Sequence, residues 1–125
     1  MNKMISTTPT ISKEIFMEIL QDDRLVKKHT LLIFQTIYSA DKQELSATDI
    51  AKQIGWKDKM SVISRFVSLG KRIEKHYKIL PRMREDGSKS YWDLFFTGYE
   101  KGKFFMFQLR PELKKALEEC CLVDS

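Results

Sequence analysis

The pattern of apolar and polar positions divides the chain into helical segments and one strand-rich segment. Apolar residues recur three and four positions apart, which predicts helices over residues 12–21, 24–39, 46–54 and 59–77. Between about residues 91 and 109, aromatic and aliphatic residues replace this spacing and predict an antiparallel hairpin. A final helix is predicted to start at Pro111. We therefore expect an α+β fold, mainly α with a small β-hairpin.

The middle of the chain carries the start and stop signals of two consecutive helices. Ser46 and Asp49 have the pattern of a capping box, and Gly55 stands where a helix can end in a left-handed residue. Asp58 can cap the next helix, and residues 44–46 can add a short strand ahead of the first. A short helix, a tight break and a longer helix are typical of a helix-turn-helix, whose second helix enters the major groove of DNA.

The long helix predicted over 59–77 separates an apolar face from a face of serines and cations. The residues predicted to be buried are Ile63, Phe66, Val67, Gly70, Ile73 and Tyr77. Small serines on the other face allow close approach to a groove, and arginine can bind guanine through two hydrogen bonds. A glycine weakens a helix by about 1 kcal/mol, so we expect a neighbouring group to come close to Gly70.

The positive charge of the chain is concentrated in and after this helix. The whole chain carries +5, whereas residues 57–89 hold ten Lys or Arg and four Asp or Glu, a net +6. Such a stretch is the expected footprint of a nucleic-acid binder, with a solvated charged face as the alternative. Base contacts are predicted from Arg65 and Ser61, and base or phosphate contacts from Ser64, Ser68, Arg72 and Lys75. The residues predicted to bind the DNA backbone are Lys57, Lys59, Arg82, Arg84 and Lys89.

The sequence offers no pattern for an active site or a metal centre. Cys120 and Cys121 are adjacent, which makes a strained disulfide and no metal-ligand spacing, and we expect them to pack as small apolar residues. His29 and His76 have no ligand set or catalytic partner near them in sequence. We therefore predict that the protein is not an enzyme and uses no cofactor and no metal.

Length and composition predict one domain and its cellular setting. With 125 residues the chain can bury a core without disulfides or metal. Residues 1–10 are predicted as a flexible N-terminal arm and 11–125 as a single domain. No apolar run approaches the about 20 residues that span a membrane, and residues 1–14 lack the apolar segment of a secretory signal, so we expect a cytoplasmic protein.

Residues from about 45 to 119 resemble the winged helix-turn-helix domains found beside bacterial restriction-type endonucleases and related defence proteins. The matching pieces are DIAKQIGW at 49–56, SLGKRIEK at 68–75 and FQLRPELKKALE at 107–118. The resemblance implies a winged helix-turn-helix with additional N- and C-terminal helices, and recognition of DNA. The chain lacks the nuclease of the larger family members, so nuclease activity is not implied.

Two functions follow from these patterns. The first is sequence- or structure-specific binding of double-stranded DNA, as a transcriptional regulator or as the DNA-reading part of a defence or mobile-element system. The alternative is a protein-interaction module of winged-helix shape, such as a small phage or mobile-element inhibitor or regulator of a host nuclease, with the aromatic hairpin as its surface. Because helix-turn-helix proteins commonly read two half-sites, a homodimer through helix 12–21 or the C-terminal helix is also expected.

Overall fold

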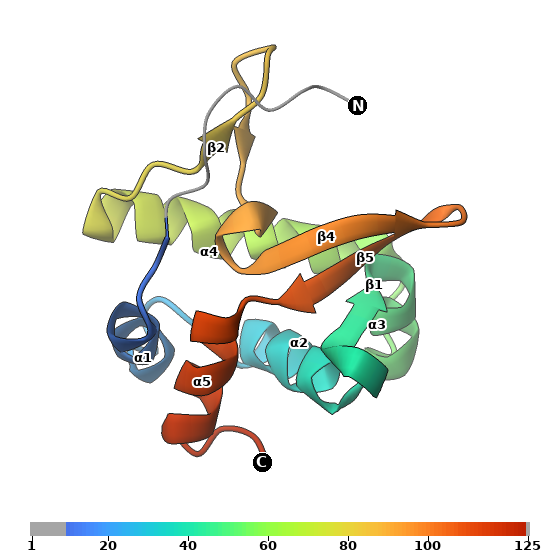
Figure 1. Cartoon of the computed structure of the whole chain (residues 1–125), viewed down its shortest axis with the longest axis horizontal. Helices are drawn as coiled ribbons and strands as arrows, with labels where there is room; N and C mark the ends of the chain where they lie inside the picture. Colours follow the sequence, from blue (N-terminus) through green and yellow to red (C-terminus); the bar gives the residue numbers. More distant parts are fainter. Residues whose placement is uncertain (1–9, 125) are drawn as a thin grey trace.

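Helices make up most of the fold, and a small sheet and a two-stranded ribbon complete it (Figure 1). The computed structural model describes residues 10–124, so most of the predicted arm at 1–10 lies outside the described residues. The elements are α1 (Lys13–Gln21), α2 (Lys28–Ser39), η1 (Asp41–Gln43), β1 (Glu44–Ser46), α3 (Ala47–Ile54), α4 (Lys59–Tyr77), β2 (Arg82–Met83), β3 (Lys89–Ser90), η2 (Trp92–Leu94), β4 (Phe96–Lys101), β5 (Phe104–Leu109) and α5 (Pro111–Glu119). The predicted α+β class is confirmed.

The three-stranded sheet joins a strand from the middle of the chain to the hairpin near its end. β5 lies in the centre, with β1 antiparallel on one side and β4 antiparallel on the other. Phe107 of β5 stands opposite Leu45 of β1 and Gly98 of β4. Because β1 pairs only with residues 106–108, the half of the hairpin that carries the turn at Gly102 extends past it (Figure 1).

The break between α3 and α4 is built by the residues that the sequence indicates. Ser46 caps α3, since its Oγ accepts the backbone N–H of Asp49 at 3.1 Å. Gly55 ends α3 in the left-handed region at φ +87°, and its N–H donates to the Ala51 carbonyl at 2.9 Å. Asp58 then caps α4. These local signals fix both helix ends, and the predicted bounds of α4 are confirmed.

The second helix starts later than predicted, at Lys28 rather than at residue 24. The Asp22 carboxylate accepts the backbone N–H of Arg24 at 3.0 Å and also its guanidinium, which turns the chain after α1. The turn lets Leu25 and Val26 become buried before the helix begins. The same guanidinium and backbone hydrogen bonds lower the pKa of Asp22 to about 2.

The predicted hairpin at 91–109 is shorter than expected. Residues Trp92–Leu94 form a helical turn, and β4 begins only at Phe96. The sequence predicts that residues 99–102 close the hairpin, but Tyr99–Lys101 belong to β4 and the chain reverses at Gly102 and Lys103. The helical turn forms because Leu94 and Phe95 can both be buried there, which an extended strand with alternating faces would not allow.

The buried face of α4 is rotated from the predicted one. Val62 and Leu69 are buried, whereas Ile63, Val67 and Tyr77 are half-buried. The reason is that α4 packs on α2, α3 and η2, while its contacts with β4 and β5 are few. Its flank towards the hairpin is therefore left partly open.

Gly70 lies in close contact with Tyr91, as its position inside a helix led us to expect. A Cβ atom built on Gly70 would lie 2.5 Å from Cδ1 of Tyr91 and 2.7 Å from its Cβ. The Tyr91 hydroxyl donates to Glu74 at 2.8 Å, and burial together with this bond raises the pKa of Tyr91 to about 12. The glycine thus lets η2 dock on the middle of α4.

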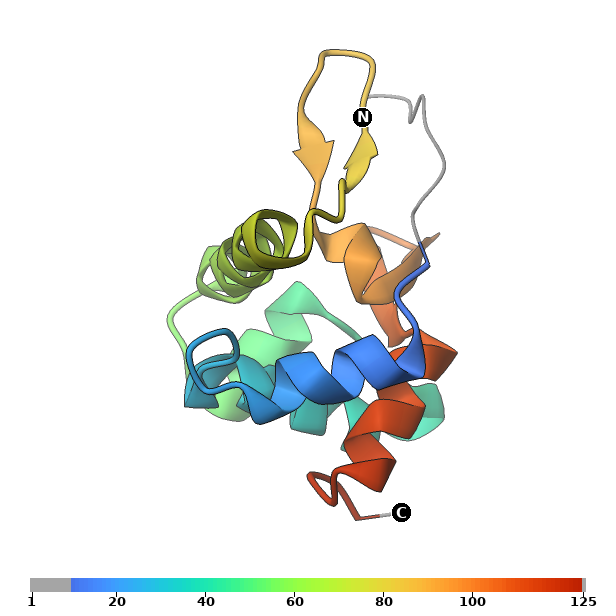
Figure 2. The same cartoon turned by 90° about the vertical axis from the view of Figure 1, so that its left-hand side faces the viewer.

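Residues 82–90 form a two-stranded ribbon, called here the arm, that rises from the body of the molecule (Figure 2). Its base is fixed by Asp93, whose side chain is 4% exposed. The Asp93 carboxylate accepts from Arg82 at 3.2 Å and from Arg110 at 2.9 Å. A buried carboxylate held by two guanidiniums therefore ties the arm to the start of α5.

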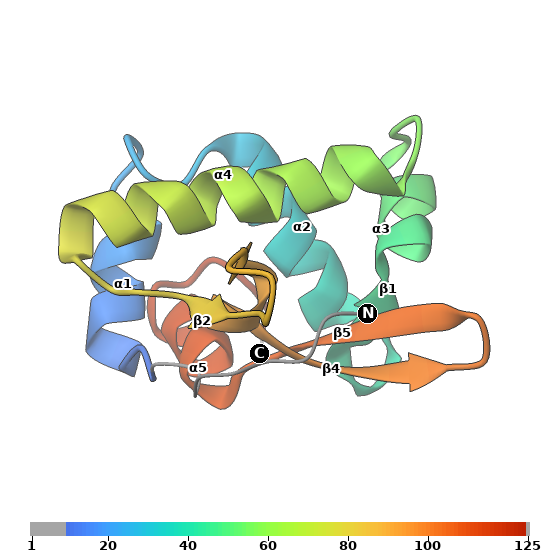
Figure 3. The same ribbon diagram turned by 90° about the horizontal axis from the view of Figure 1, so that it is seen from above.

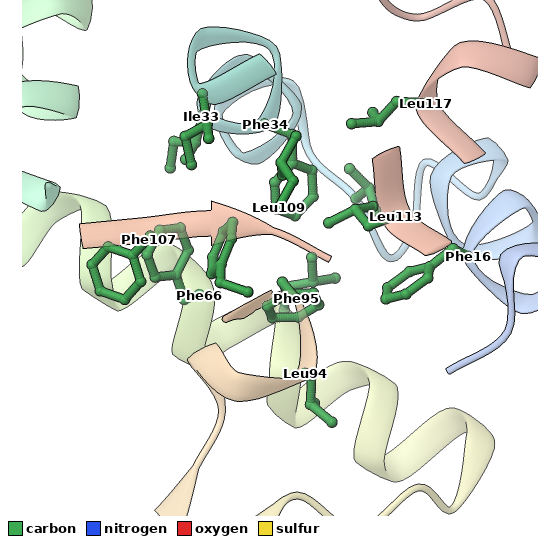
Figure 4. Packing of buried hydrophobic residues seen from close by; sticks show 14 of the residues in the cluster. Phe16, Ile33, Phe34, Phe66, Leu94, Phe95, Phe107, Leu109, Leu113 and Leu117 are labelled. Carbon is green, nitrogen blue, oxygen red and sulfur yellow. The ribbon is translucent and has the colours of Figure 1, made fainter. Parts of the chain in front are cut away.

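Aromatic side chains from the helices and the hairpin meet in one core (Figure 4). The ring centroids of Phe34 in α2 and Phe95 lie 5.8 Å apart, and those of Phe66 in α4 and Phe96 lie 4.7 Å apart. α1 and α5 pack against each other, with Phe16 buried between them and the core. Phe95, Phe96 and Phe107 are thus covered within the chain, whereas Tyr99 and Phe104 of the hairpin are exposed. The apolar faces of both helices considered for a dimer are also covered.

Candidate nucleic-acid interface

α4 presents a stripe of four solvent-exposed residues, Ser64, Ser68, Lys71 and Lys75. Their spacing of four, three and four residues places them on one face of the helix. The Ser64 hydroxyl donates to the Ser61 carbonyl at 3.0 Å. Lys71 is missing from the set predicted to bind DNA, although its spacing from Ser64 and Ser68 could have identified it. We call these four residues the α4 stripe.

Lys57 and Lys59 are exposed at the N-terminal end of α4. The Asp58 carboxylate caps this end of the helix, so its negative charge offsets part of the positive charge of the two lysines. Ser61, predicted to read bases, instead belongs to the helix cap. Its N–H and its hydroxyl both donate to the Asp58 carboxylate, at 3.2 and 3.3 Å.

Arg65 and Arg72 lie along one edge of the α4 stripe, on the side of α2. The Arg65 guanidinium lies 5.8 Å from the ring centroid of Trp56, which itself packs at the corner between α3 and α4. Arg72 donates through Nε to the Leu25 carbonyl at 2.9 Å. The pKa of Arg72 is lowered, mainly by its burial and to a smaller extent by repulsion from Arg65. Arg72 therefore has a structural bond, with only its terminal nitrogens left for another partner.

The three cations predicted to contact the DNA backbone from the arm have partners inside the protein. Arg82 bonds Asp93, as described above. Arg84 donates to the Lys89 carbonyl at 2.9 Å and to the Ser88 hydroxyl at 3.3 Å. Lys89 forms an ion pair with Glu74, and this bond, with that from Tyr91, lowers the pKa of Glu74. Sequence alone could not reveal the pairs of Arg82 and Lys89, because these join separate elements, whereas the bonds of Arg84 are local to the arm.

The turn of the hairpin adds two lysines that sequence reasoning missed. Lys101 and Lys103 flank Gly102 and are exposed. Lys103 and Lys59 line the same hollow of about 110 Å³, between α4, the start of α3 and β5. Lys59 at the N-terminal end of α4 and Lys103 at the hairpin turn therefore border the same space. The available signal was the pattern of a lysine on each side of a turn glycine.

The lysines around α4 and the hairpin turn lack ion-pair partners in the described part of the chain. Within residues 10–124, no ion pair involves Lys57, Lys59, Lys71, Lys75, Lys101 or Lys103. These lysines belong to the turn before α4, to α4 itself and to the hairpin turn. Exposed cations without partners can bind phosphate without first breaking a bond inside the protein.

Other kinds of site find little support in the geometry. His29 packs against Trp56 and His76 against Tyr77, at 6.0 and 4.8 Å between ring centroids. Cys120 is half-buried, Cys121 is exposed, and both are free thiols. Among the described residues there is no group of three or more His, Cys, Asp or Glu that could hold a metal ion. No helix in the described part of the chain is long and apolar enough to cross a bilayer.

Comparisons with protein-family models, with curated proteins and with solved structures return no match for this chain.

Proposed function

We propose that this protein is a winged helix-turn-helix that binds double-stranded DNA, with α4 in the major groove and the β4–β5 hairpin as the wing. The order of elements supports this proposal, since a helix, a short strand and two helices precede the β4–β5 hairpin, with the arm and η2 inserted between α4 and the hairpin. The pairing of β1 with β5 also supports it, because it holds the hairpin beside the two helices.

The observation that carries the proposal is the set of lysines without ion pairs on α4 and the hairpin turn. The α4 stripe combines short hydroxyls with two of these lysines and has no carboxylate. Lys57 and Lys59 would bind phosphates at one end of the helix, and Lys101 and Lys103 would do so from the wing. Arg65 would reach bases or phosphates from the edge of the stripe.

The proposal is tested by titrating the protein with a fluorescent duplex of about 25 base pairs at two salt concentrations. With about five phosphate contacts, affinity should fall roughly 500-fold between about 50 and 200 mM salt. Replacing Lys71 and Lys75 with alanine should weaken binding about 10-fold and reduce the salt slope by about 2. The matched control replaces Lys114 and Lys115 of α5, which lies on the side of the molecule away from the arm (Figure 2).

Both double variants lose two positive charges. Comparing their DNA affinities therefore distinguishes binding at the α4 stripe from a nonspecific attraction of the positively charged protein to DNA. The α5 variant should bind DNA within about 2-fold of the parent. Equal losses in both variants would show that the α4 stripe is not the binding surface. Retention of the parent's far-UV circular dichroism by both variants is required for the comparison.

A protein-interaction module remains the second candidate, and the arm favours it. Its turn carries Glu85 and Asp86, and it rises from the same side of the molecule as α4 (Figures 2 and 3). Acidic side chains there would repel a phosphate backbone but could meet a basic protein surface. Absence of duplex binding even at about 50 mM salt would favour this candidate over DNA.

A further inference from the structure

A hollow of about 260 Å³ lies between α4, the hairpin and the arm. It is lined by Ile63, Phe66, Arg84, Trp92, Phe105 and Phe107. We call it the aromatic hollow. It lies at the partly open flank of α4, and Arg84 of the arm contributes to its lining.

The aromatic hollow is held open by contacts around it. The ring of Phe105 packs directly on Gly98 of β4, since a Cβ atom built on Gly98 would lie 2.3 Å from that ring. On the other side, Tyr91 docks on Gly70 and Asp93 anchors the arm. These fixed points keep the walls apart, which makes the site pre-formed in the free protein.

Three aromatic rings form one wall of the aromatic hollow. The centroids of Trp92 and Phe105 lie 5.2 Å apart, those of Trp92 and Phe107 5.7 Å, and those of Phe105 and Phe107 5.3 Å, all edge-to-face. Trp92 and Phe105 are only half-buried, so ring surface remains available. Such a wall favours another flat ring, which can continue the edge-to-face packing.

Arg84 supplies the charge. Among the described residues that line the aromatic hollow, it is the one that is ionised. Its bonds to the Lys89 carbonyl and the Ser88 hydroxyl use one terminal nitrogen, Nη1, and hold the guanidinium in place. The remaining N–H groups form a fork suited to a carboxylate.

We propose that the aromatic hollow binds a small planar molecule of one or two fused rings that carries a carboxylate. An apolar cavity of about 150 Å³ can hold benzene, so about 260 Å³ accommodates a bicyclic ring with one substituent. The rings would pack against Trp92 and Phe105, and the carboxylate would bind Arg84. This site does not depend on DNA binding.

The test uses nuclear magnetic resonance of the ¹⁵N-labelled full chain, with 1-naphthoate as the anionic probe and 1-naphthamide as its uncharged counterpart. The chain has two tryptophans, Trp56 and Trp92, and a W56F variant assigns their indole signals. Naphthoate at millimolar concentration should shift the Trp92 indole signal and leave that of Trp56 in place. Absence of a Trp92 shift with naphthoate would overturn the proposal.

Two charge variants test the role of Arg84. R84Q should weaken naphthoate binding at least about 10-fold and leave naphthamide binding unchanged. K101Q removes one positive charge from the hairpin outside the aromatic hollow and should leave both unchanged. Equal binding of the two probes by the parent protein, or equal weakening by R84Q and K101Q, would overturn the assignment of a carboxylate site.

Discussion

Replacing Gly70 with alanine should destabilise the protein, although alanine is the better helix former. The added Cβ would lie 2.5, 2.7 and 2.8 Å from Cδ1, Cβ and Cγ of Tyr91, where carbon atoms normally approach to about 3.5 Å. These atoms lie near the backbone, and the hydroxyl at the other end is bonded to Glu74, so the ring cannot move aside cheaply. Overpacking of this kind costs about 3 kcal/mol, and the gain in helix propensity is about 1 kcal/mol. The expected net loss is about 2 kcal/mol.

Urea unfolding followed by circular dichroism measures this change in the free energy of unfolding. Introducing G70A into chains that are altered at Tyr91 tests the proposed cause. In a Y91G chain the contacting atoms are gone, so G70A should then stabilise the protein by about 1 kcal/mol. In a Y91F chain the ring remains, and G70A should still destabilise. The reasoning is wrong if G70A has the same effect on the free energy of unfolding in the Y91G chain as in the parent.

Three further predictions concern the arm and the interface. D93N should lower the free energy of unfolding in urea by about 2 to 3 kcal/mol, because it leaves two partly solvated guanidiniums without their carboxylate. The bonds of Glu74 to Lys89 and Tyr91 lower its pKa from 4.5, so its stabilising effect is present above pH 4.5 and is lost as pH falls through the lowered value. E74Q should therefore show a smaller drop than the parent in the urea midpoint of unfolding between about pH 7 and pH 3. R65A should weaken duplex binding about 10-fold in fluorescence anisotropy. The melting temperature of the R65A protein should stay within about 3 °C of the parent's, since an exposed cation–π contact contributes only about 0.5–1 kcal/mol.

The sequence predicts those parts of the fold that short-range signals determine. Ser46, Gly55 and Asp58 act within three or four residues of their own positions, so the ends of α3 and α4 are readable without tertiary structure. The turn at Gly87 is local too, since the pair Asp86-Gly87 predicts a turn from the sequence and Gly87 adopts a φ of +86°. The late start of α2 also has a local cause, the Asp22 side chain, but the pattern of apolar residues masks it.

The remaining features depend on contacts between distant segments. The rotation of α4 is set by which elements pack on it, and periodicity alone gives two adjacent faces that fit almost equally well. Likewise, Arg82 and Lys89 look like free cations in the sequence because Asp93 and Glu74 lie 11 and 15 residues away from them. Of the predicted DNA-binding residues, those of α4 mostly remain available, and those of the arm are engaged within the chain.

The pairing of β1 with β5 has a consequence for how the protein is made. Leu45 finds its strand partner, Phe107, only 62 residues later in the chain. As the polypeptide leaves the ribosome, α2, α3 and α4 will be complete while the apolar side chains meant for the hairpin have nothing to cover them. Contacts this distant slow folding, and exposed apolar surface invites association with other chains. We therefore expect the nascent protein to keep this apolar surface exposed until β5 has left the ribosome.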